Sequence, residues 1–208
     1  MKKTSLLNFL GHSLTDMSTL LLILSNVAVI FLALIENWDL STIMFIYWCQ
    51  SVIIGFFTFF KILNLKNFTK NGNVEFNFRK TSKLGIALFF AFHYGFFHFT
   101  YLLFLMFLPR FNILQPLNFQ DTYILLAAGI FFVNHLFSFL YNRKKDAEKK
   151  QYIGKVMMFP YIRIIPMHIT IIFGSMFMLM GLPQIALVLF LILKMLADVI
   201  MHKMEHRI

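Results

Sequence analysis

Six long apolar stretches, separated from one another by charged or turn-forming residues, run along this chain of 208 residues. A bilayer core about 30 Å thick is crossed by a helix of roughly 20 mostly apolar residues, which is close to the length of each stretch. The pattern predicts an all-α fold, a polytopic transmembrane helical bundle that forms a single domain over 1–208. The six spans are expected at about 17–35, 41–63, 84–108, 121–141, 156–180 and 184–202.

Proline and glycine predict irregular geometry in the second half of the chain. Pro160 and Pro166 interrupt the fifth stretch, so this span should be kinked, because proline within a helix removes a backbone hydrogen bond. Gly181-Leu182-Pro183 predicts a tight reversal into the sixth span. Ahead of the first span, a short N-terminal interfacial helix is expected from the helical spacing of Leu6, Leu7, Leu10 and Leu14.

The composition excludes a water-soluble globule. Hydrophobic residues make up 59% of the chain and charged residues only 13%, whereas soluble domains contain about 25% charged residues. The mean hydropathy is +0.74. Cys49 is the single cysteine, so the chain can form neither an intramolecular disulfide nor a metal cluster of several cysteines.

The net charge of +10 is best explained by membrane topology. Lysine and arginine gather in the N-terminal tail, in the loops after the second and fourth predicted spans, and in the C-terminal tail. Cytoplasmic loops are enriched in these residues, so both termini are expected in the cytoplasm. We expect a multi-pass protein of the cell membrane that binds no nucleic acid and whose basic loops attract anionic lipid headgroups.

Three ionisable residues, Arg163, Lys194 and Asp198, fall inside predicted spans. Each costs about 2.5 to 3.5 kcal/mol at the centre of a membrane helix, so each needs a partner or a function. With a rise of about 1.5 Å per residue, all three lie between the inner leaflet and the midplane. The same band contains further polar side chains: Gln50, His93, His98, His135 and His168. These groups come from several spans and predict a polar layer inside the bundle.

The last span carries ionisable residues one helical turn apart: Lys194, Asp198, His202 and His206, with Glu205 beside them. An Asp-x-x-x-His pair can hold one metal ion from two successive turns. The candidate metal ligands are therefore His93, His168, Asp198 and His202. Imidazole and carboxylate ligands without thiolate favour zinc or iron.

Other interpretations of these residues stay open. Arg163 and Asp198 have matching depth and would also suit a buried ion pair between the last two spans. The polar residues after position 201 would suit an ordinary helix end at the membrane boundary. His93 and His98 are about 140° apart around an ideal helix, so they can face one centre only if the helix bulges between them.

Three groups of residues carry a family resemblance. They are Tyr47-Trp48 with Ile54-Gly55 and Lys61, then His93-Tyr94-Gly95 with Phe96 and His98, and last Lys194, Asp198, His202 and Glu205-His206. With them the chain resembles the domain of unknown function 6498 family of prokaryotic multi-pass membrane proteins. The resemblance implies a compact helical membrane protein and no established activity. The family tends to have Glu-Asn where this chain has Gln50-Ser51. The Asp198-x-x-x-His202-x-x-x-His206 pattern also resembles, more loosely, membrane hydrolases related to alkaline ceramidases.

The leading functional hypothesis is a metal-dependent intramembrane hydrolase, in which metal-bound water attacks a lipid or an amide. The polar band also suits a small proton-coupled transporter, with the span broken by Pro166 as its moving element. A b-type haem protein with His93 and His168 as axial ligands is a third hypothesis. A structural membrane subunit, held together by the polar band, is a fourth. The sequence decides neither the substrate nor the oligomeric state, nor whether the protein is an enzyme.

Overall fold

The computed structural model describes residues 17–35, 38–66, 68–69, 82–107, 122–148 and 151–207. Its long helices are α2 (Met17–Ile35), α3 (Leu40–Asn64), α4 (Lys83–Phe107), α5 (Thr122–Glu148) and α9 (Pro183–Arg207). Between α5 and α9 lie α6 (Ile153–Ile162), α7 (Ile165–Ile169), the π-helical turn η3 (Thr170–Gly174) and α8 (Ser175–Leu179). The prediction of an all-α bundle is confirmed, apart from two strands of two residues each. The predicted N-terminal interfacial helix lies outside the described residues.

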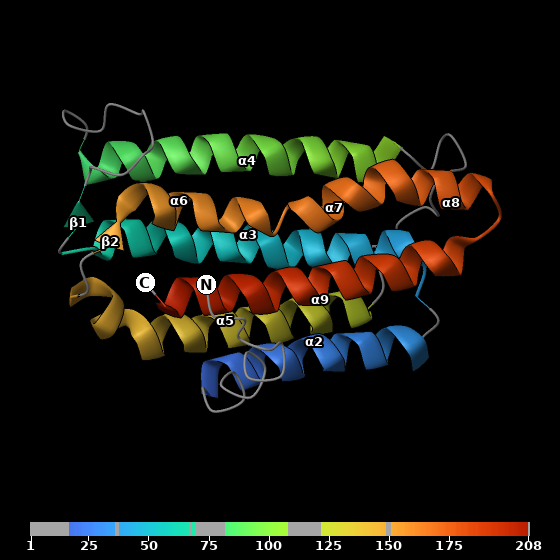
Figure 1. Cartoon of the computed structure of the whole chain (residues 1–208), viewed down its shortest axis with the longest axis horizontal. Helices are drawn as coiled ribbons and strands as arrows, with labels where there is room; N and C mark the ends of the chain where they lie inside the picture. Colours follow the sequence, from blue (N-terminus) through green and yellow to red (C-terminus); the bar gives the residue numbers. More distant parts are fainter. Residues whose placement is uncertain are drawn as a thin grey trace, which may run out of the picture.

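The long helices lie side by side along a common axis (Figure 1). Helix α3 is central and packs against α4, α5 and α6, while α9 packs against α2 and the broken segment that precedes it. Large apolar side chains on the outer helices are exposed, such as Phe92 on α4 (78%) and Leu125 on α5 (71%). A soluble protein rarely exposes apolar surface on this scale, whereas lipid covers it readily.

Four helical segments in the described part of the chain are long and apolar enough to cross a membrane: Leu40–Asn64, Lys83–Phe107, Ile124–Glu148 and Ile153–Phe173. They coincide with the second to fifth predicted spans, so the assignment to the integral membrane class agrees with the structure. The first and sixth predicted spans form helices α2 and α9. That these two helices also cross the membrane stays a prediction.

The fifth span is broken, as its prolines predict. Helix α6 ends at Ile162, and the backbone N–H groups of Arg163 and Ile164 bond three residues back, to Pro160 O at 3.2 Å and Tyr161 O at 3.0 Å. Pro166 stands in the first turn of α7 and has no N–H to donate, which leaves the carbonyl of Ile162 without its helical donor. The turn at Arg163 therefore interrupts the helix inside the bundle.

A helical bulge is present, but not between His93 and His98, where one would be needed for both imidazoles to face one centre. Helix α4 is continuous through His93 and His98, and the π-helical turn lies instead at Thr170–Gly174 in the fifth span. In the regular helix His93 is exposed and His98 is buried, at 4% exposure, so the two imidazoles face different sides. The predicted reversal is present, with Gly181 at φ +73° and Pro183 beginning α9.

The ends of α3 and α5 meet at one end of the bundle. Strand β1 (Phe68–Thr69) pairs in parallel with β2 (Gln151–Tyr152). Nearby, Lys61 Nζ lies 2.9 Å from Asp146 Oδ2. The two basic loops predicted to be cytoplasmic therefore begin at the same end of the molecule.

Helices α3 and α4 come close at Gly55, whose added Cβ would lie 2.5 Å from the ring of Tyr94. The Tyr94 hydroxyl also lies 2.8 Å from Ser51 Oγ. Gly95, on α4 itself, has no neighbouring atom within 4 Å of a Cβ built on it. Gly55, on the partner helix, provides the close approach instead.

Candidate charged site in the bundle

The centre of the site is an ion pair within α9. Lys194 Nζ lies 2.5 Å from Asp198 Oδ2, one helical turn away, and both residues are buried at 6% and 2% exposure. The four-residue spacing brings the two side chains onto one face of the helix, as the sequence pattern indicated. In a low-dielectric interior such a pair offsets the desolvation of both charges only when further polar groups complete it.

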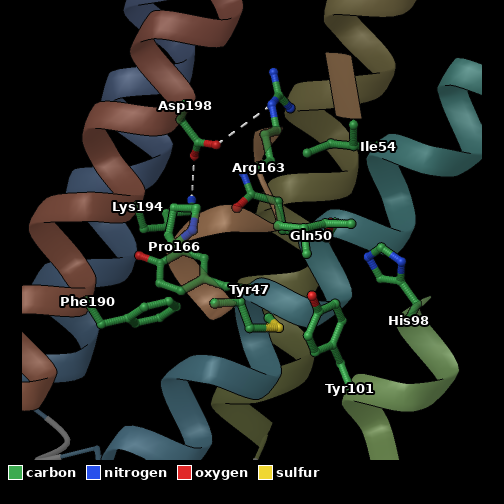
Figure 2. A pocket seen from close by; sticks show the side chains of 13 residues that line it. Tyr47, Gln50, Ile54, His98, Tyr101, Arg163, Pro166, Phe190, Lys194 and Asp198 are labelled. Atoms are coloured by element: carbon green, nitrogen blue, oxygen red, sulfur yellow. Dashed lines mark ion pairs between the residues drawn. The ribbon is translucent and has the colours of Figure 1, made fainter. Parts of the chain in front are cut away.

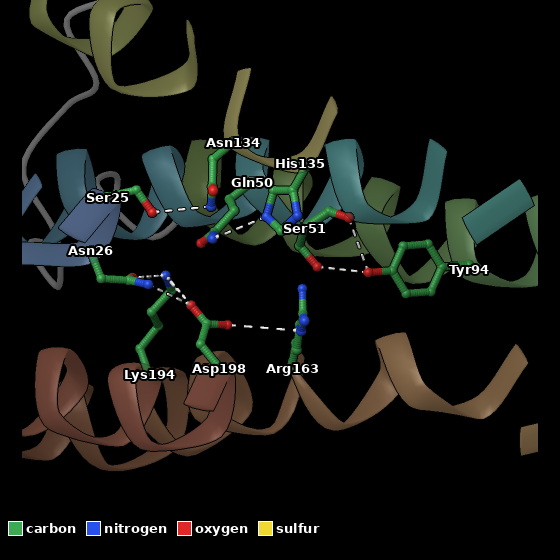
Figure 3. Close-up of polar contacts among 10 residues, drawn as sticks. All are labelled: Ser25, Asn26, Gln50, Ser51, Tyr94, Asn134, His135, Arg163, Lys194 and Asp198. Carbon is green, nitrogen blue, oxygen red and sulfur yellow. Dashed lines mark hydrogen bonds and ion pairs between the residues drawn. The ribbon is translucent and has the colours of Figure 1, made fainter. Parts of the chain in front are cut away.

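Asn26 of α2 completes the pair from the opposite side (Figure 3). Its Nδ2 donates to Asp198 Oδ2 at 3.2 Å, and its Oδ1 accepts from Lys194 Nζ. One side-chain amide thus bonds both members of the ion pair. This residue ties the first helix of the chain to the last one.

Arg163 approaches the same carboxylate from the break between α6 and α7. Its Nε lies 3.9 Å from Asp198 Oδ1, longer than a direct hydrogen bond, and its side chain is only 8% exposed. The outer guanidinium nitrogens form no hydrogen bond with any residue that the structure describes. Arg163 and Lys194 together oppose one carboxylate, so the described cluster carries one excess positive charge.

Aromatic rings surround the lysine. The Nζ atom of Lys194 lies 3.8 Å from the centroid of the Tyr47 ring and 4.9 Å from that of Phe131. Phe190 packs edge-on against Tyr47, with ring centroids 5.3 Å apart. The negative faces of aromatic rings attract a cation, more strongly when water is excluded. These contacts therefore stabilise a buried ammonium group.

A small cavity adjoins the cluster (Figure 2). Its volume is about 20 Å³, and its polar lining includes Tyr47, Gln50, His98, Arg163, Lys194 and Asp198. Pro166 and Met167, from the broken span, complete one wall. A polar cavity of this size can hold about one water molecule.

His98 separates this cavity from a much larger groove. Its Nδ1 lies 2.8 Å from the carbonyl of Tyr94, which can only accept, so Nδ1 carries the proton and Nε2 is the acceptor in the neutral ring. The same imidazole lines an apolar groove of about 630 Å³ between α3 and α4. The indole of Trp48 donates to the carbonyl of His98 at 2.8 Å and holds this part of α4 against α3.

The remaining predicted histidines have other partners. Gln50 Nε2 lies 3.4 Å from His135 Nε2, which joins α3 to α5 beside the cluster. His93 Nδ1 lies 2.7 Å from the Tyr161 hydroxyl, and His168 Nδ1 contacts the Tyr101 hydroxyl. Both His93 and His168 are exposed, whereas Tyr101, the partner of His168, is buried and lines the small cavity.

The described residues do not support the proposed metal site. No three His, Cys, Asp or Glu side chains among them lie close enough to hold a metal ion. Asp198, a predicted ligand, is bonded to Lys194 and Asn26 instead. The side chains of His202, Glu205 and His206 lie outside the described residues, although the α9 backbone includes all three. His93 and His168, the candidate haem ligands, each have a tyrosine partner, as described above.

Two important members of the site were not identified from the sequence. Asn26 stands beside Ser25 in the middle of a mostly apolar span, and an amide in such a place is itself a signal of helix-to-helix bonding. Ser25 Oγ accepts from Asn134 Nδ2 at 3.2 Å, which adds a link from α2 to α5. Tyr47 was identified only as part of the Tyr47-Trp48 family motif, and its contact with the lysine gave no signal of its own, because aromatic residues are abundant throughout the chain.

Comparison with known proteins identifies the family of this chain, but that family has no known activity. The model of a family of unknown function, DUF6498, matches residues 10–208. Neither a curated protein nor a solved structure matches the chain.

Proposed function

The chain belongs to the family of unknown function DUF6498, as its sequence motifs suggested, and we propose that it is a small proton-coupled membrane transporter. Because the family has no known activity, the argument for this function comes from the side chains of the chain itself. The observation that carries this proposal is the position of the charged cluster. Arg163 lies in the break of the fifth span, and its partner Asp198 lies on the adjacent helix α9.

The topology in this proposal has six spans, with α2 and α9 crossing the membrane together with the four apolar segments. Both termini then lie in the cytoplasm of a multi-pass protein of the cell membrane. The meeting of the loops after α3 and α5, through β1 and β2, supports this arrangement. These loops carry the basic residues expected on the cytoplasmic side.

A broken helix beside buried charges is typical of transporter substrate sites. Interrupted spans expose backbone groups near the midplane and can move as separate halves around a bound solute. Here the break at Arg163 and the π-helical turn at Thr170–Gly174 divide the fifth span into short pieces. We assign the segment α7–α8 the role of the moving element, against α9 as the fixed one.

Two groups at the cavity can take up protons. Nε2 of His98 is the free acceptor of that imidazole, and His98 lines the cavity. Asp198 is the only carboxylate among the described residues that line the cavity. Protonation of either group adds one positive charge to the site, so proton binding and solute binding are coupled electrostatically.

The geometry favours transport over metal-dependent hydrolysis. A hydrolase of the predicted type needs Asp198 as a metal ligand, but its carboxylate is held by an ammonium and an amide. A cation bound there would also be repelled by Lys194 and Arg163.

Flux into liposomes tests the proposal. The purified protein is reconstituted with a pH-sensitive dye trapped inside, and small anions, cations and neutral solutes are added outside in turn. At least one solute is expected to cause a protein-dependent change in internal pH. In Arg163→Gln that rate should fall by roughly tenfold or more, because one charge-assisted hydrogen bond contributes about 1.5 to 3 kcal/mol.

The matched control is Arg143→Gln, which removes an exposed arginine near the end of α5. Its rate should equal that of the wild-type protein. The transporter assignment fails if no solute changes the internal pH beyond the rate in protein-free liposomes. It fails equally if the two arginine variants cannot be distinguished.

A further inference from the structure

We infer that Tyr101 and His168 form the gate of the small cavity, and that a solute reaches the charged cluster between α4 and α7. The inference rests on the proposed transport function and deepens it, because it names the route by which the solute enters. It is carried by two hydrogen bonds of the same kind, one on each side of the break in the fifth span.

These two bonds join α4 to the two halves of the broken span. Before the break, His93 Nδ1 of α4 lies 2.7 Å from the hydroxyl of Tyr161 in α6. After the break, the hydroxyl of Tyr101 in α4 is hydrogen-bonded to Nδ1 of His168 in α7. Each half is thus tied to α4 by one imidazole and one phenol, with Arg163 between the two ties.

The first half of the span is also held by packing. Helix α6 packs against the central helix α3. The Tyr161 ring lies against further rings of α4, with centroids 5.3 Å from Tyr94, 6.1 Å from Phe97 and 6.2 Å from Phe90. Loss of the bond to His93 leaves these contacts in place, so α6 should stay against α4.

The second half has a weaker hold on α4. Helix α7 packs against α9 and the π-helical turn that follows it. In the part of the chain that the structure describes, the bond between Tyr101 and His168 is the one side-chain hydrogen bond from α7 to α4. The two rings meet edge-on, with centroids 5.3 Å apart. A single hydrogen bond contributes little net stability, so this tie can open while the rest of the bundle stays folded.

The tie lies at the wall of the cavity. Tyr101 is buried, at 3% exposure, and extends from α4 toward the cavity that it lines (Figure 2). Pro166 and Met167, which precede His168 in α7, line the same cavity. His168 itself is exposed at the molecular surface. The bond between Tyr101 and His168 therefore closes the seam between α4 and α7, and a movement of α7 away from α4 opens the cavity to that surface.

Thiol labelling of the purified full-length protein tests the gate. Met167→Cys places a thiol at the cavity wall, at a position where the native side chain is 5% exposed. Its reaction with N-ethylmaleimide is followed by mass spectrometry. Adding Tyr101→Phe keeps the ring and removes the hydroxyl, so the labelling rate at position 167 should rise by about threefold to tenfold, the factor expected for one lost hydrogen bond. The native Cys49 of α3 is the reference thiol, and its rate should not change.

The matched control is Tyr161→Phe, which removes the corresponding bond from α6. The labelling rate at position 167 should then equal that of Met167→Cys alone, because the ring packing of Tyr161 remains. Equal rates in the two tyrosine variants would overturn the gate. Equal acceleration at positions 167 and 49 would overturn it too, since the whole bundle would then have loosened.

If one of these variants does not fold, amide hydrogen exchange of the wild-type protein decides. The gate requires α7 to exchange in a separate and faster phase than α6, whereas one common phase refutes it. The liposome assay keeps the two proposals apart. Labelling that follows the gate, without flux of any solute, would refute the transporter and leave the gate intact. Flux together with equal labelling in the two tyrosine variants would refute only the gate.

Discussion

Asp198→Asn is expected to destabilise the folded protein by about 3 to 5 kcal/mol, because removal of one partner leaves buried charges uncompensated. The substitution conserves side-chain size and leaves Lys194 and Arg163 facing a neutral amide. The cluster then holds two excess positive charges instead of one. Unfolding of the purified protein by titration with a denaturing detergent measures the change in free energy.

The matched control for this substitution is Asp146→Asn. Asp146 also pairs with a lysine, at 2.9 Å from Lys61, but at the end of the bundle and with a more exposed side chain, 18% against 3% for Asp198. Solvent screens such a pair, so its loss should cost about 0 to 1 kcal/mol. Similar losses from the two substitutions would show that the Asp198 carboxylate is not enclosed.

Phe131→Ala is expected to cost about 3 kcal/mol, from the cavity left by the ring and from the loss of its contact with the lysine. Phe131 is fully buried and packs against Tyr47, and Lys194 Nζ lies 4.9 Å from its centroid. Helix association within lipid depends on close packing, so a cavity at this point is not relieved by the surrounding acyl chains. The same detergent titration gives the change in the free energy of unfolding.

The neighbouring Phe132 provides the comparison. It is 42% exposed and faces outward from the same helix turn. Phe132→Ala should change the free energy of unfolding by no more than about 0.5 kcal/mol, as exposed substitutions usually do. A larger loss at position 132 than at 131 would contradict the assignment of which face of α5 packs inward.

The sequence predicted the helices well where a strong local signal was present. Long apolar runs marked the four helical segments able to span a membrane, and Pro160 and Pro166 marked the broken span. The reversal at Gly181 followed from the residue types required by a left-handed turn before a new helix. Each of these features depends on neighbouring residues in the chain alone.

Side-chain partners were harder to predict, because depth along a helix is only one of the coordinates that place a residue. Depth correctly suggested a pair between Arg163 and Asp198. It could not show that His93 faces outward to Tyr161, or that Asn26 faces inward to Asp198. Rotation about each helix axis is difficult to infer when both faces are apolar, because lipid and the bundle interior accept the same residue types.

The most direct test of the enclosed charged site is a double-mutant cycle between Arg163 and Asp198. The free energy of detergent-induced unfolding is measured for four proteins: the wild-type protein, Arg163→Gln, Asp198→Asn and the double variant. Arg163→Gln alone leaves a balanced pair of Lys194 and Asp198, and the double variant has one fewer uncompensated charge than Asp198→Asn. The double variant should therefore lose less stability than the sum of the two single losses, by about 1 kcal/mol or more, within the range for interacting residues. Strictly additive losses, equal to within about 0.5 kcal/mol, would instead mean that the two charges do not share one site.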